Sequence, residues 1–397
     1  MATSIGGPVE LKGMTLPELE ALASGLGGPA YRGRQIARWV YQGNASSFAE
    51  MSDLPASLRG RLAEAAVLTS LEPLTEVTAD GGDTVKYLVS LADGATVETV
   101  FMRYEDGRRS VCISTQVGCG MGCTFCATGL AGLTRNLTAA EIIDQVLLVQ
   151  RKQRERITNV VFMGMGEPLA NYQATLRALQ VLNAPYGLGI GMRHLTVSTV
   201  GLVPQIQMLA KERLQFTLAV SLHAPDDDLR SALVPINRRW PISELLTASG
   251  VYVRQTGRRV SFEYVLLEGV NDRPDQGALL GRLLAEHARA IGETPAAAWH
   301  VNLIPWNPVY GMQYHRPGRG RVEGFLTELD RRGVPATVRL ERGIEIDAAC
   351  GQLQRTHGLT EGGDAATRSA GDAPPRRAGT SAGTRPVQEE AASRNPT

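Results

Sequence analysis

Hydrophobic residues recur every three or four positions through the first 70 residues, which is the spacing of one face of an α-helix. The first stretch follows Thr15, a residue that can cap a helix. Its leucines are Leu16, Leu19, Leu22 and Leu26. Two more amphipathic stretches, at residues 30–41 and from about 55 to 66, place arginines opposite their apolar positions. This pattern predicts a small helical domain over residues 1–70.

After residue 70 the pattern changes to an alternation of apolar and polar positions. Residues 84–91 and 95–102 alternate in this way, and the Asp93-Gly94 pair between them is typical of a tight turn. We therefore expect a β-hairpin extension over residues 71–109.

From residue 110 onward, short apolar runs alternate with longer helical stretches. The apolar runs are at 110–116, 157–163, 194–199, 216–222, 259–267 and 299–304, with a last one at 336–340. The helical stretches are at 138–151, 172–182, 241–255, 274–290 and 321–331. Because connections of this length join parallel strands, the pattern predicts an α/β fold, a partial (β/α)6 TIM-like barrel over residues 110–355. A doubly wound sheet is the alternative.

Composition adds three expectations. Residues 356–397 are rich in Gly, Ala, Ser, Thr, Pro and Arg and lack aromatic residues, which predicts a disordered tail. No apolar run is long enough to cross a membrane, and the first residues do not resemble a secretory signal, so we expect a cytoplasmic protein. A net charge of +1 neither demands nor excludes a nucleic-acid partner.

Three of the five cysteines lie within eight positions, in C-x3-C-x2-C spacing, just after the first predicted barrel strand. These are Cys119, Cys123 and Cys126, and the glycines among them favour a loop in which the thiolates converge. A structural zinc ion usually takes four ligands, so Cys112 or Cys350 would have to supply the fourth. Three thiolates favour an iron–sulfur cluster in which one iron stays open to a small molecule.

Polar or glycine-rich segments follow other predicted strands as well. They are Gly164-Met-Gly-Glu-Pro168, Ser198, Ser221-Leu-His223 and Pro305-Trp-Asn307. Active sites of parallel barrels lie where the carboxyl ends of the strands meet. The sequence therefore predicts that these segments share one site with the cysteines.

The cysteine spacing, with the aromatic residue Phe125 before the last cysteine, resembles the motif of the radical S-adenosylmethionine (SAM) superfamily. The resemblance implies a [4Fe–4S] cluster on Cys119, Cys123 and Cys126, with the amino and carboxylate groups of SAM on its open iron. It also implies that an electron from the cluster cleaves SAM and releases a 5′-deoxyadenosyl radical.

Six segments together resemble a narrower family, the bacterial dual-specificity adenine-C2 methyltransferases of 23S rRNA and tRNA. They are 117–129, 162–171, 197–201, 221–224, 302–307 and 348–353, of which the last, Ala-Ala-Cys-Gly-Gln-Leu, is the most specific. The resemblance spans residues 10–355. It implies methylation of an adenine in the peptidyl-transferase centre of 23S rRNA and of the adenine 3′ of the anticodon in tRNA.

The resemblance also assigns catalytic roles. An sp2 carbon such as adenine C2 is not a nucleophile, so it cannot take a methyl group from SAM by simple displacement. Cys350 is implied to accept the methyl group of one SAM as S-methylcysteine. After the radical from a second SAM removes a hydrogen, this group is implied to form a transient protein–RNA crosslink. Cys112 is implied to resolve the crosslink, and Glu98 to accept a proton.

The remaining roles concern cofactor and partners. Gly166 and Glu167 resemble the segment that holds the SAM amino group. Further SAM contacts are implied for Ser198, Ser221, Leu222, His223 and Asn307. Taken singly, Cys112, Ser198 and His223 are also compatible with core residues, and Glu98 with an exposed strand position.

The implied partners are 23S rRNA, tRNA and an electron donor such as flavodoxin or ferredoxin, with no membrane and a monomeric protein. The candidate RNA-docking face carries Arg32, Arg34, Arg38, Arg59 and Arg61, for which a solvated surface is the alternative.

Two other functions stay open at this point. A C8 methyltransferase of the same rRNA adenine would share the two-cysteine chemistry, although the Gly164–Pro168 segment favours the C2 enzymes. A zinc-stabilised RNA-binding protein without catalysis would use the cysteines only as structural ligands.

Overall fold

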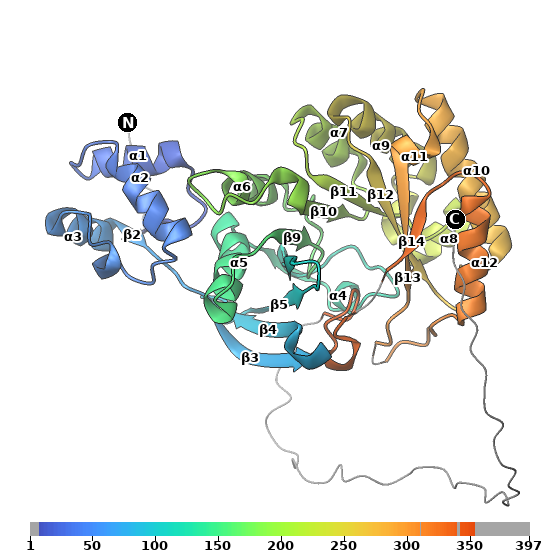
Figure 1. The fold of residues 1–397 in the computed structure, drawn as a ribbon, viewed down its shortest axis with the longest axis horizontal. Helices are drawn as coiled ribbons and strands as arrows, with labels where there is room; N and C mark the ends of the chain where they lie inside the picture. The colour runs from blue at the N-terminus through green and yellow to red at the C-terminus, as the bar shows by residue number, and fades with distance from the viewer. Residues whose placement is uncertain (1–7, 310, 340–341, 354–397) are drawn as a thin grey trace, which may run out of the picture. The chain divides into compact units, whose positions relative to one another are not determined.

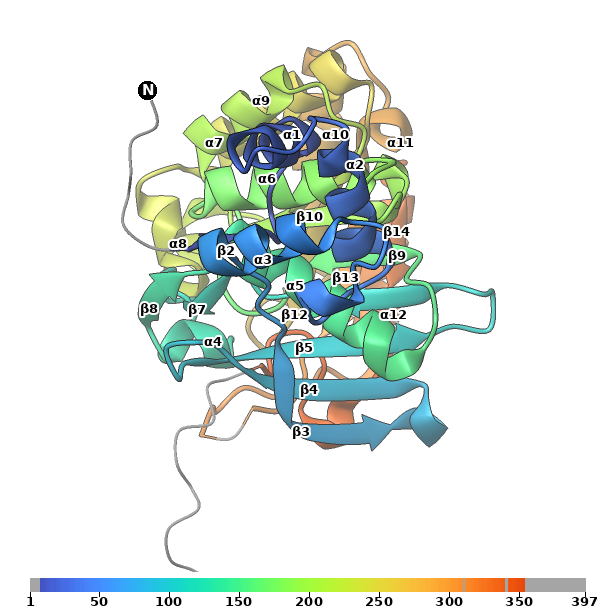
Figure 2. The same ribbon diagram turned by 90° about the vertical axis from the view of Figure 1, so that its left-hand side faces the viewer.

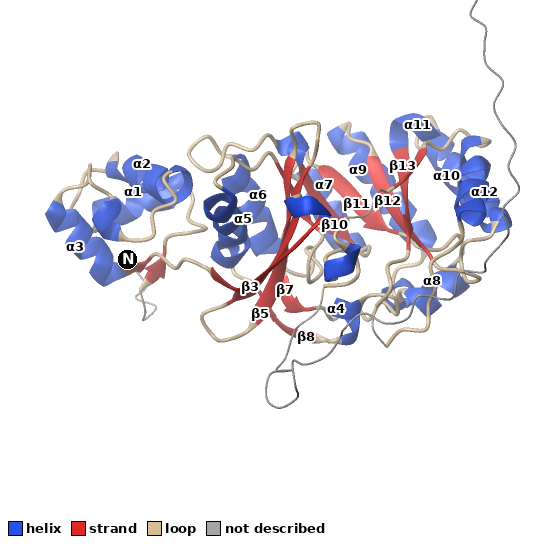
Figure 3. Cartoon of the chain, turned by 60° about the horizontal axis from the view of Figure 1, so that its bottom comes forward, coloured by secondary structure: helices blue, strands red, loops and turns tan. Residues whose placement is uncertain are grey.

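Ten strands in the described part of the chain form one mixed sheet, seen among the red strands of Figure 3. The structure, a computed structural model, describes residues 8–309, 311–339 and 342–353, which belong to one unit of the chain. Seven of the strands are parallel and follow one another in chain order across the sheet. They are β6 (Arg109–Cys112), β9 (Asn159–Phe162), β10 (Leu195–Thr199), β11 (Thr217–Ser221), β12 (Val260–Leu266), β13 (Trp299–Pro305) and β14 (Ala336–Val338).

This strand order confirms the α/β prediction and distinguishes between its two versions. A doubly wound sheet reverses its strand order at a switch point, whereas these strands run β6-β9-β10-β11-β12-β13-β14 without a reversal. Both β14 and the antiparallel strand β3 (Glu72–Ala79) are edges of the sheet, so the barrel is open. The partial barrel is therefore the correct version.

Helices connect the parallel strands close to the predicted positions. The predicted ones are α5 (Ala139–Gln153), α6 (Tyr172–Asn183), α9 (Ile242–Thr256), α10 (Pro274–Ala290) and α12 (Arg319–Asp330). The sequence analysis missed α7 (Val203–Lys211), although its buried Ile206, Leu209 and Ala210 have helical spacing. Nine residues are few for an argument from periodicity, which explains the omission.

The alternation of side chains along β12 separates the core from the site. Phe262 packs on Trp299 with ring centroids 5.4 Å apart, and Tyr264 packs on Phe325 of α12 at 5.0 Å. Glu263 lies between Phe262 and Tyr264 in sequence, and its side chain lines a cavity on the opposite face of the sheet. The helices therefore cover one face of the sheet, and the cavity lies on the other.

Replacing Trp299 by alanine is expected to lower the free energy of unfolding by about 3–5 kcal/mol, the usual cost of removing a large buried aromatic side chain. Trp299 is fully buried, and its indole N–H donates to the Leu284 carbonyl at 3.0 Å. Urea unfolding followed by circular dichroism measures the change. Leu279→Ala is the control, because Leu279 of α10 is 37% exposed and should cost little. Equal losses in the two variants would contradict this packing argument.

The predicted β-hairpin is present and joins the main sheet. It consists of β4 (Thr84–Ser90) and β5 (Thr96–Arg103), and β5 pairs with β6 of the barrel. The outer strand β3 was not predicted, because most of its residues are exposed and it lacks a clear apolar face. The domain boundaries at residues 70 and 109 stay predictions.

The N-terminal helices lie beside α5 and α6, as Figures 1 and 2 show in blue against green. They are α1 (Leu16–Gly25), α2 (Arg32–Ala37) with a π-helical turn at Arg38–Gln42, and α3 (Ala56–Ala65). Short strands β1 (Val9–Glu10) and β2 (Ala66–Val67) pair in parallel where the chain enters and leaves them. The predicted disordered tail lies outside the described residues. No helix in the described ranges has the length and apolar character needed to cross a bilayer.

Candidate active site

The three clustered cysteines lie in a loop that a small hairpin closes. Its strands are β7 (Gln116–Gly118) and β8 (Leu133–Asn136), and the short helix α4 (Ala127–Leu130) begins directly after Cys126. Gly118 has φ +78°, and a Cβ there would lie 1.9 Å from the Gly132 carbonyl oxygen, so only glycine fits. The Cys119 N–H donates to that same oxygen at 2.9 Å. The glycine thus permits the close crossing that shapes the loop.

All three cysteines line one cavity of about 160 Å³ at the carboxyl ends of the parallel strands. Five of the seven residues predicted to contact SAM line the same cavity, namely Gly166, Glu167, Ser198, Ser221 and His223. The other two do not: Leu222 is buried in the sheet, and Asn307 donates from its amide to the Cys350 carbonyl at 3.3 Å. The predicted convergence of separate strand ends is therefore present in the fold.

The donor set of the loop fits an iron–sulfur cluster. Burial raises the pKa of Cys119 to about 12 and also raises the pKa of Cys123 and Cys126. Thiolates at such positions need a nearby positive charge, which a bound metal centre supplies. Within the described ranges, no three His, Cys, Asp or Glu side chains converge closely enough to hold a single metal ion. A cluster differs in this respect, because it distributes its thiolates over several irons.

The Gly166–Glu167 turn forms one wall of the cavity. Gly166 has φ +102°, and a Cβ there would lie 2.6 Å from the side chain of Gln116. The Glu167 carboxylate accepts hydrogen bonds from the backbone N–H groups of Val200, at 2.7 Å, and Leu169, at 3.0 Å. Burial nevertheless raises the pKa of Glu167 to about 7. Its carboxylate is thus held in place by two loops and is available to a cationic group in the cavity.

His223 lies on the opposite wall as a neutral imidazole. Its Nδ1 accepts a hydrogen bond from the Val265 N–H at 3.0 Å, which leaves the ring proton on Nε2. Burial, together with the nearby Arg230 charge, lowers the pKa of His223 to about 3. Its φ of +62° is a strained conformation for a residue with a side chain, of a kind that clusters at functional sites.

Arg230 is a fully buried cation that the sequence analysis did not identify. Its guanidinium donates to the carbonyls of Val200, Ser221 and Leu222 at 2.7–3.0 Å. Burial lowers the pKa of Arg230 to about 10. The side chain therefore joins the ends of β10 and β11, where the predicted SAM contacts lie. An arginine in a polar stretch such as 226–231 has no sequence signal that distinguishes it from a surface residue.

Cys350 borders two cavities. It lines the main cavity with the three clustered cysteines, and it also lines a second cavity of about 40 Å³. Cys112, at the end of β6, lines only this second cavity. Burial raises the pKa of Cys112 to about 12, so its thiol is protonated at neutral pH. The two predicted reactive cysteines therefore share a cavity, and Cys350 lies between that cavity and the clustered cysteines.

Backbone contacts hold the Cys350 segment against the cysteine loop. The Ala127 N–H of α4 donates to the Gly351 carbonyl at 2.9 Å, and the Thr128 hydroxyl donates to the Leu353 carbonyl at 2.5 Å. Directly after β13, the Trp306 indole N–H donates to the Phe125 carbonyl at 3.2 Å. These bonds place a residue near the end of the described chain next to the first loop of the barrel.

Glu98 lies apart from both cavities. Its buried carboxylate pairs with Lys86 of β4 at 3.0 Å, and the Lys86 ammonium also donates to the Asp347 carbonyl at 3.3 Å. Lys86 thus connects Glu98 to the segment that carries Cys350. Glu98 is therefore buried on its strand, unlike the exposed position that was the alternative reading.

Arg339 is a second residue that the sequence analysis missed. It follows β14, lines both cavities, and places Nη1 3.8 Å from the Glu263 carboxylate and 3.5 Å from the Met163 sulfur. Its position near the end of the last predicted strand, 336–340, was an available signal, because polar residues at the other strand ends also form the site. It is a cation that lines both cavities together with Cys350.

Several of the N-terminal arginines are partly neutralised. Arg34 pairs with Glu20 at 3.1 Å, and Arg38 pairs with Asp53. Both arginine side chains are more than half exposed, so they remain accessible from solvent. Their position agrees with either a docking face or a solvated surface.

Sequence and structure comparisons agree with this site. Residues 113–277 match a family model described as the radical SAM superfamily, and residues 9–68 match one described as the ribosomal RNA large subunit methyltransferase N-terminal domain. A probable dual-specificity RNA methyltransferase RlmN of Pelotomaculum thermopropionicum is 53% identical over 351 residues, covering 88% of this chain and 93% of the relative. The corresponding protein of Symbiobacterium thermophilum is 51% identical over 354 residues, covering 87% and 92%.

A solved structure is similar as well. The crystal structure of a radical SAM methyltransferase from Sphaerobacter thermophilus shares 50% sequence identity and a TM-score of 0.81, and the match covers 87% of this chain and 99% of that one. The open barrel and its cysteine loop are thus those of a radical SAM enzyme. Within that superfamily, the chain belongs to the family of dual-specificity RNA methyltransferases.

This membership implies a [4Fe–4S] cluster and SAM as cofactors and RNA as the substrate. Membership in an enzyme family does not agree with the alternative function, a zinc-stabilised RNA-binding protein without catalysis.

Proposed function

We propose that this enzyme methylates C2 of an adenine in the peptidyl-transferase centre of 23S rRNA and of the adenine 3′ of the anticodon in tRNA. Methylation proceeds through S-methylcysteine at Cys350 and a transient protein–RNA crosslink. The similarity of the chain to dual-specificity RNA methyltransferases over most of its length supports the two RNA substrates.

One observation supports the two-cysteine route above all others. Cys350 borders both cavities, the cluster cysteines line only the first, and Cys112 lines only the second. A group carried by Cys350 is therefore accessible both from the first cavity, where SAM would bind, and from the second cavity, which Cys112 lines. We assign the second cavity to the target adenine, which must leave its stack to enter a protein site of this kind.

In the first step the Cys350 thiolate attacks the methyl carbon of a SAM sulfonium. A sulfur–carbon bond forms on Cys350, the methyl–sulfur bond of SAM breaks, and neutral S-adenosylhomocysteine leaves. The Arg339 cation lines both cavities together with Cys350. Asn307 holds the Cys350 backbone through its carbonyl and so orients the sulfur.

The cofactor would be held by residues of the main cavity. Cys119, Cys123 and Cys126 bind the cluster, and Gly166, Glu167, Ser198, Ser221 and His223 bind SAM, with Leu222 and Asn307 in supporting positions. When bound, the cluster supplies an electron that converts a second SAM into a carbon-centred radical. Glu167, held by two backbone N–H groups, would pair with the SAM ammonium. An electron donor such as flavodoxin or ferredoxin would reduce the cluster, and the protein acts as a monomer.

The remaining chemistry is assigned to Cys112, which lines the second cavity, and to Glu98, which lies outside it. Cys112 resolves the crosslink to Cys350, and Glu98 accepts the proton that leaves adenine C2. Lys86 pairs with Glu98 at 3.0 Å and holds its side chain in place. The exposed arginines Arg34 and Arg38 of the helical domain, together with Arg32, Arg59 and Arg61, contact RNA phosphates.

Nucleoside mass spectrometry of rRNA and tRNA from a strain lacking this protein tests the proposal. We expect C2-methyladenine to disappear from both RNAs and to return when the intact chain is expressed. Loss of C8-methyladenine instead would identify the related C8 activity and contradict the C2 assignment. Loss from only one RNA would refute the dual substrate.

A further inference from the structure

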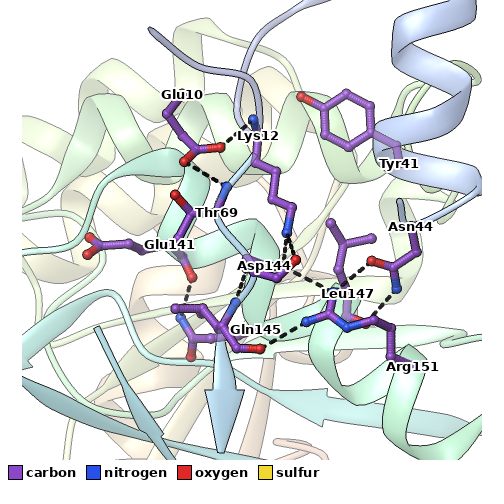
Figure 4. Close-up of polar contacts among 12 residues, drawn as sticks. Glu10, Lys12, Tyr41, Asn44, Thr69, Glu141, Asp144, Gln145, Leu147 and Arg151 are labelled. Carbon is purple, nitrogen blue, oxygen red and sulfur yellow. Dashed lines mark hydrogen bonds and ion pairs between the residues drawn. The ribbon is translucent and has the colours of Figure 1, made fainter. Parts of the chain in front are cut away.

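A buried ion pair joins the helical domain to the barrel. The Lys12 ammonium lies 2.6 Å from a carboxylate oxygen of Asp144 on α5, and the two side chains are 1% and 3% exposed (Figure 4). Lysine is rarely buried to this degree. Burial lowers the pKa of Lys12, and the Asp144 charge opposes that shift.

Asp144 also holds the other connection of the helical domain. Its second oxygen accepts the Leu71 N–H at 2.6 Å. The helices of this domain occupy residues 16–65, so Lys12 lies where the chain enters it and Leu71 where the chain leaves it. A single carboxylate on α5 thus fixes both ends of the domain.

Arg151 and Asn44 extend this junction along α5, as Figure 4 shows. The Arg151 guanidinium donates to the Leu71 carbonyl at 2.9 Å and to the Asn44 side-chain oxygen at 2.7 Å. The Asn44 amide donates to the Leu147 carbonyl of α5 at 2.8 Å. The domain is therefore attached to two successive turns of one helix.

The next residue of α5 belongs to the active-site wall. The Gln145 side chain exchanges hydrogen bonds with the backbone N–H and carbonyl of Ser114, at 2.8 and 2.9 Å. The Ser114 hydroxyl donates to the Glu98 carbonyl and accepts from the Met165 N–H. Met165 directly precedes Gly166. One turn of α5 thus holds the helical domain through Asp144 and the cavity wall through Gln145.

Stability alone is a weak reason to keep this pair. Removing two charges from water costs several kcal/mol, and apolar residues of similar volume are often as stabilising as a buried ion pair. What an ion pair adds is a defined geometry, because its two groups must meet in one arrangement. A geometric role is therefore the better explanation.

We propose that the Lys12–Asp144 pair is a positioning device that sets where RNA held by the helical domain meets the two cavities. The inference rests on the proposed role of that domain in RNA docking. Lys12 and Asp144 act through the orientation of the domain and touch neither SAM nor RNA.

The experiment uses the full chain with the double substitution Lys12→Met/Asp144→Asn, which removes both charges of the pair. Arg151 loses its 3.5 Å ion pair with Asp144 but keeps its hydrogen bonds to Asn44 and the Leu71 carbonyl, so the variant should fold. We expect the KM for an in vitro transcribed tRNA to rise at least tenfold and kcat to change less than twofold. Formation of 5′-deoxyadenosine from SAM and dithionite without RNA should change less than twofold. The Leu71 amide should exchange hydrogen faster.

Arg319→Met is the matched control, because it removes one charge from an exposed ion pair on α12. All four quantities should stay at their wild-type values in this variant. An unchanged KM for tRNA in the double variant would overturn the proposal, even if the Leu71 amide exchanged faster. An equal loss of RNA-free SAM cleavage would also overturn it, since the pair would then support the whole fold.

The dissociation constant for tRNA, measured by fluorescence anisotropy, separates this inference from the proposed function. A wild-type protein that binds tRNA without methylating it would contradict the proposed function. The effect of the double substitution on binding would still test the ion pair in that case.

Discussion

Replacing Cys350 by alanine is expected to lower RNA methylation at least about 10³-fold, because it removes the only thiol that borders both described cavities. The remaining route would be direct attack on the SAM methyl group by adenine C2. This attack does not occur, because that sp2 carbon is not a nucleophile. Cleavage of SAM in the absence of RNA should persist, since Cys350 is not among the three clustered cysteines. Nucleoside mass spectrometry and chromatography of 5′-deoxyadenosine measure the two reactions.

Cys112→Ala is the matched control for this prediction. It removes a thiol from the second cavity only, so Cys350 should still acquire a methyl group, and a covalent protein–RNA adduct should accumulate. Peptide mass spectrometry detects a mass increase on Cys350 in this variant. Methylation of RNA by Cys350→Ala at more than one per cent of the wild-type rate would refute the role given to Cys350.

Replacing Cys123 by alanine is expected to remove the cluster and, with it, all SAM cleavage. Anaerobic reconstitution of the wild-type chain should give about four irons and as many sulfides per molecule, the content of one [4Fe–4S] cluster. The variant keeps only two of the three clustered thiols, and residues 116–136 contain no further Cys, His, Asp or Glu that could replace the third. Iron and sulfide analysis, with the visible absorption of the reconstituted protein, measures the loss.

The same Cys112→Ala variant serves as the control here, because it also removes one buried cysteine. It should retain the full iron and sulfide content, since Cys112 does not line the cavity of the clustered cysteines. If Cys123→Ala kept its iron while Cys112→Ala lost it, the assignment of cluster ligands would be wrong. Zinc in place of iron in the wild-type protein would contradict the cluster itself.

Much of the barrel could be predicted because its strands are strongly apolar and its crossovers are long. The runs at 194–199 and 216–222 correspond to β10 and β11 within one residue at each end. The helix α7 escaped prediction because it is only nine residues long, and the edge strand β3 escaped prediction because most of its residues are exposed. Hydrophobic periodicity reflects which side chains are buried, so an element with few buried side chains has a weak periodic pattern in the sequence.

The residues of the site also differ in whether the sequence predicts them. Cys119, Cys123 and Cys126 are close in sequence, and their spacing alone indicates a shared metal centre. Arg339 and Arg230 stand outside any motif, and their roles depend on which cavity or carbonyl groups the fold brings to them. Lys12 and Asp144 are 132 positions apart, so no local pattern connects them.

By itself, the sequence determined the class of fold, the cluster motif and the resemblance to adenine-C2 methyltransferases, because these depend on local spacing and on short segments. Only the tertiary structure decided that Cys350 lies between two cavities and that Cys112 lines one of them. It also decided that a single carboxylate, Asp144, holds both ends of the helical domain. Such relations arise from packing between distant parts of the chain, and no single segment determines the free energy of that packing.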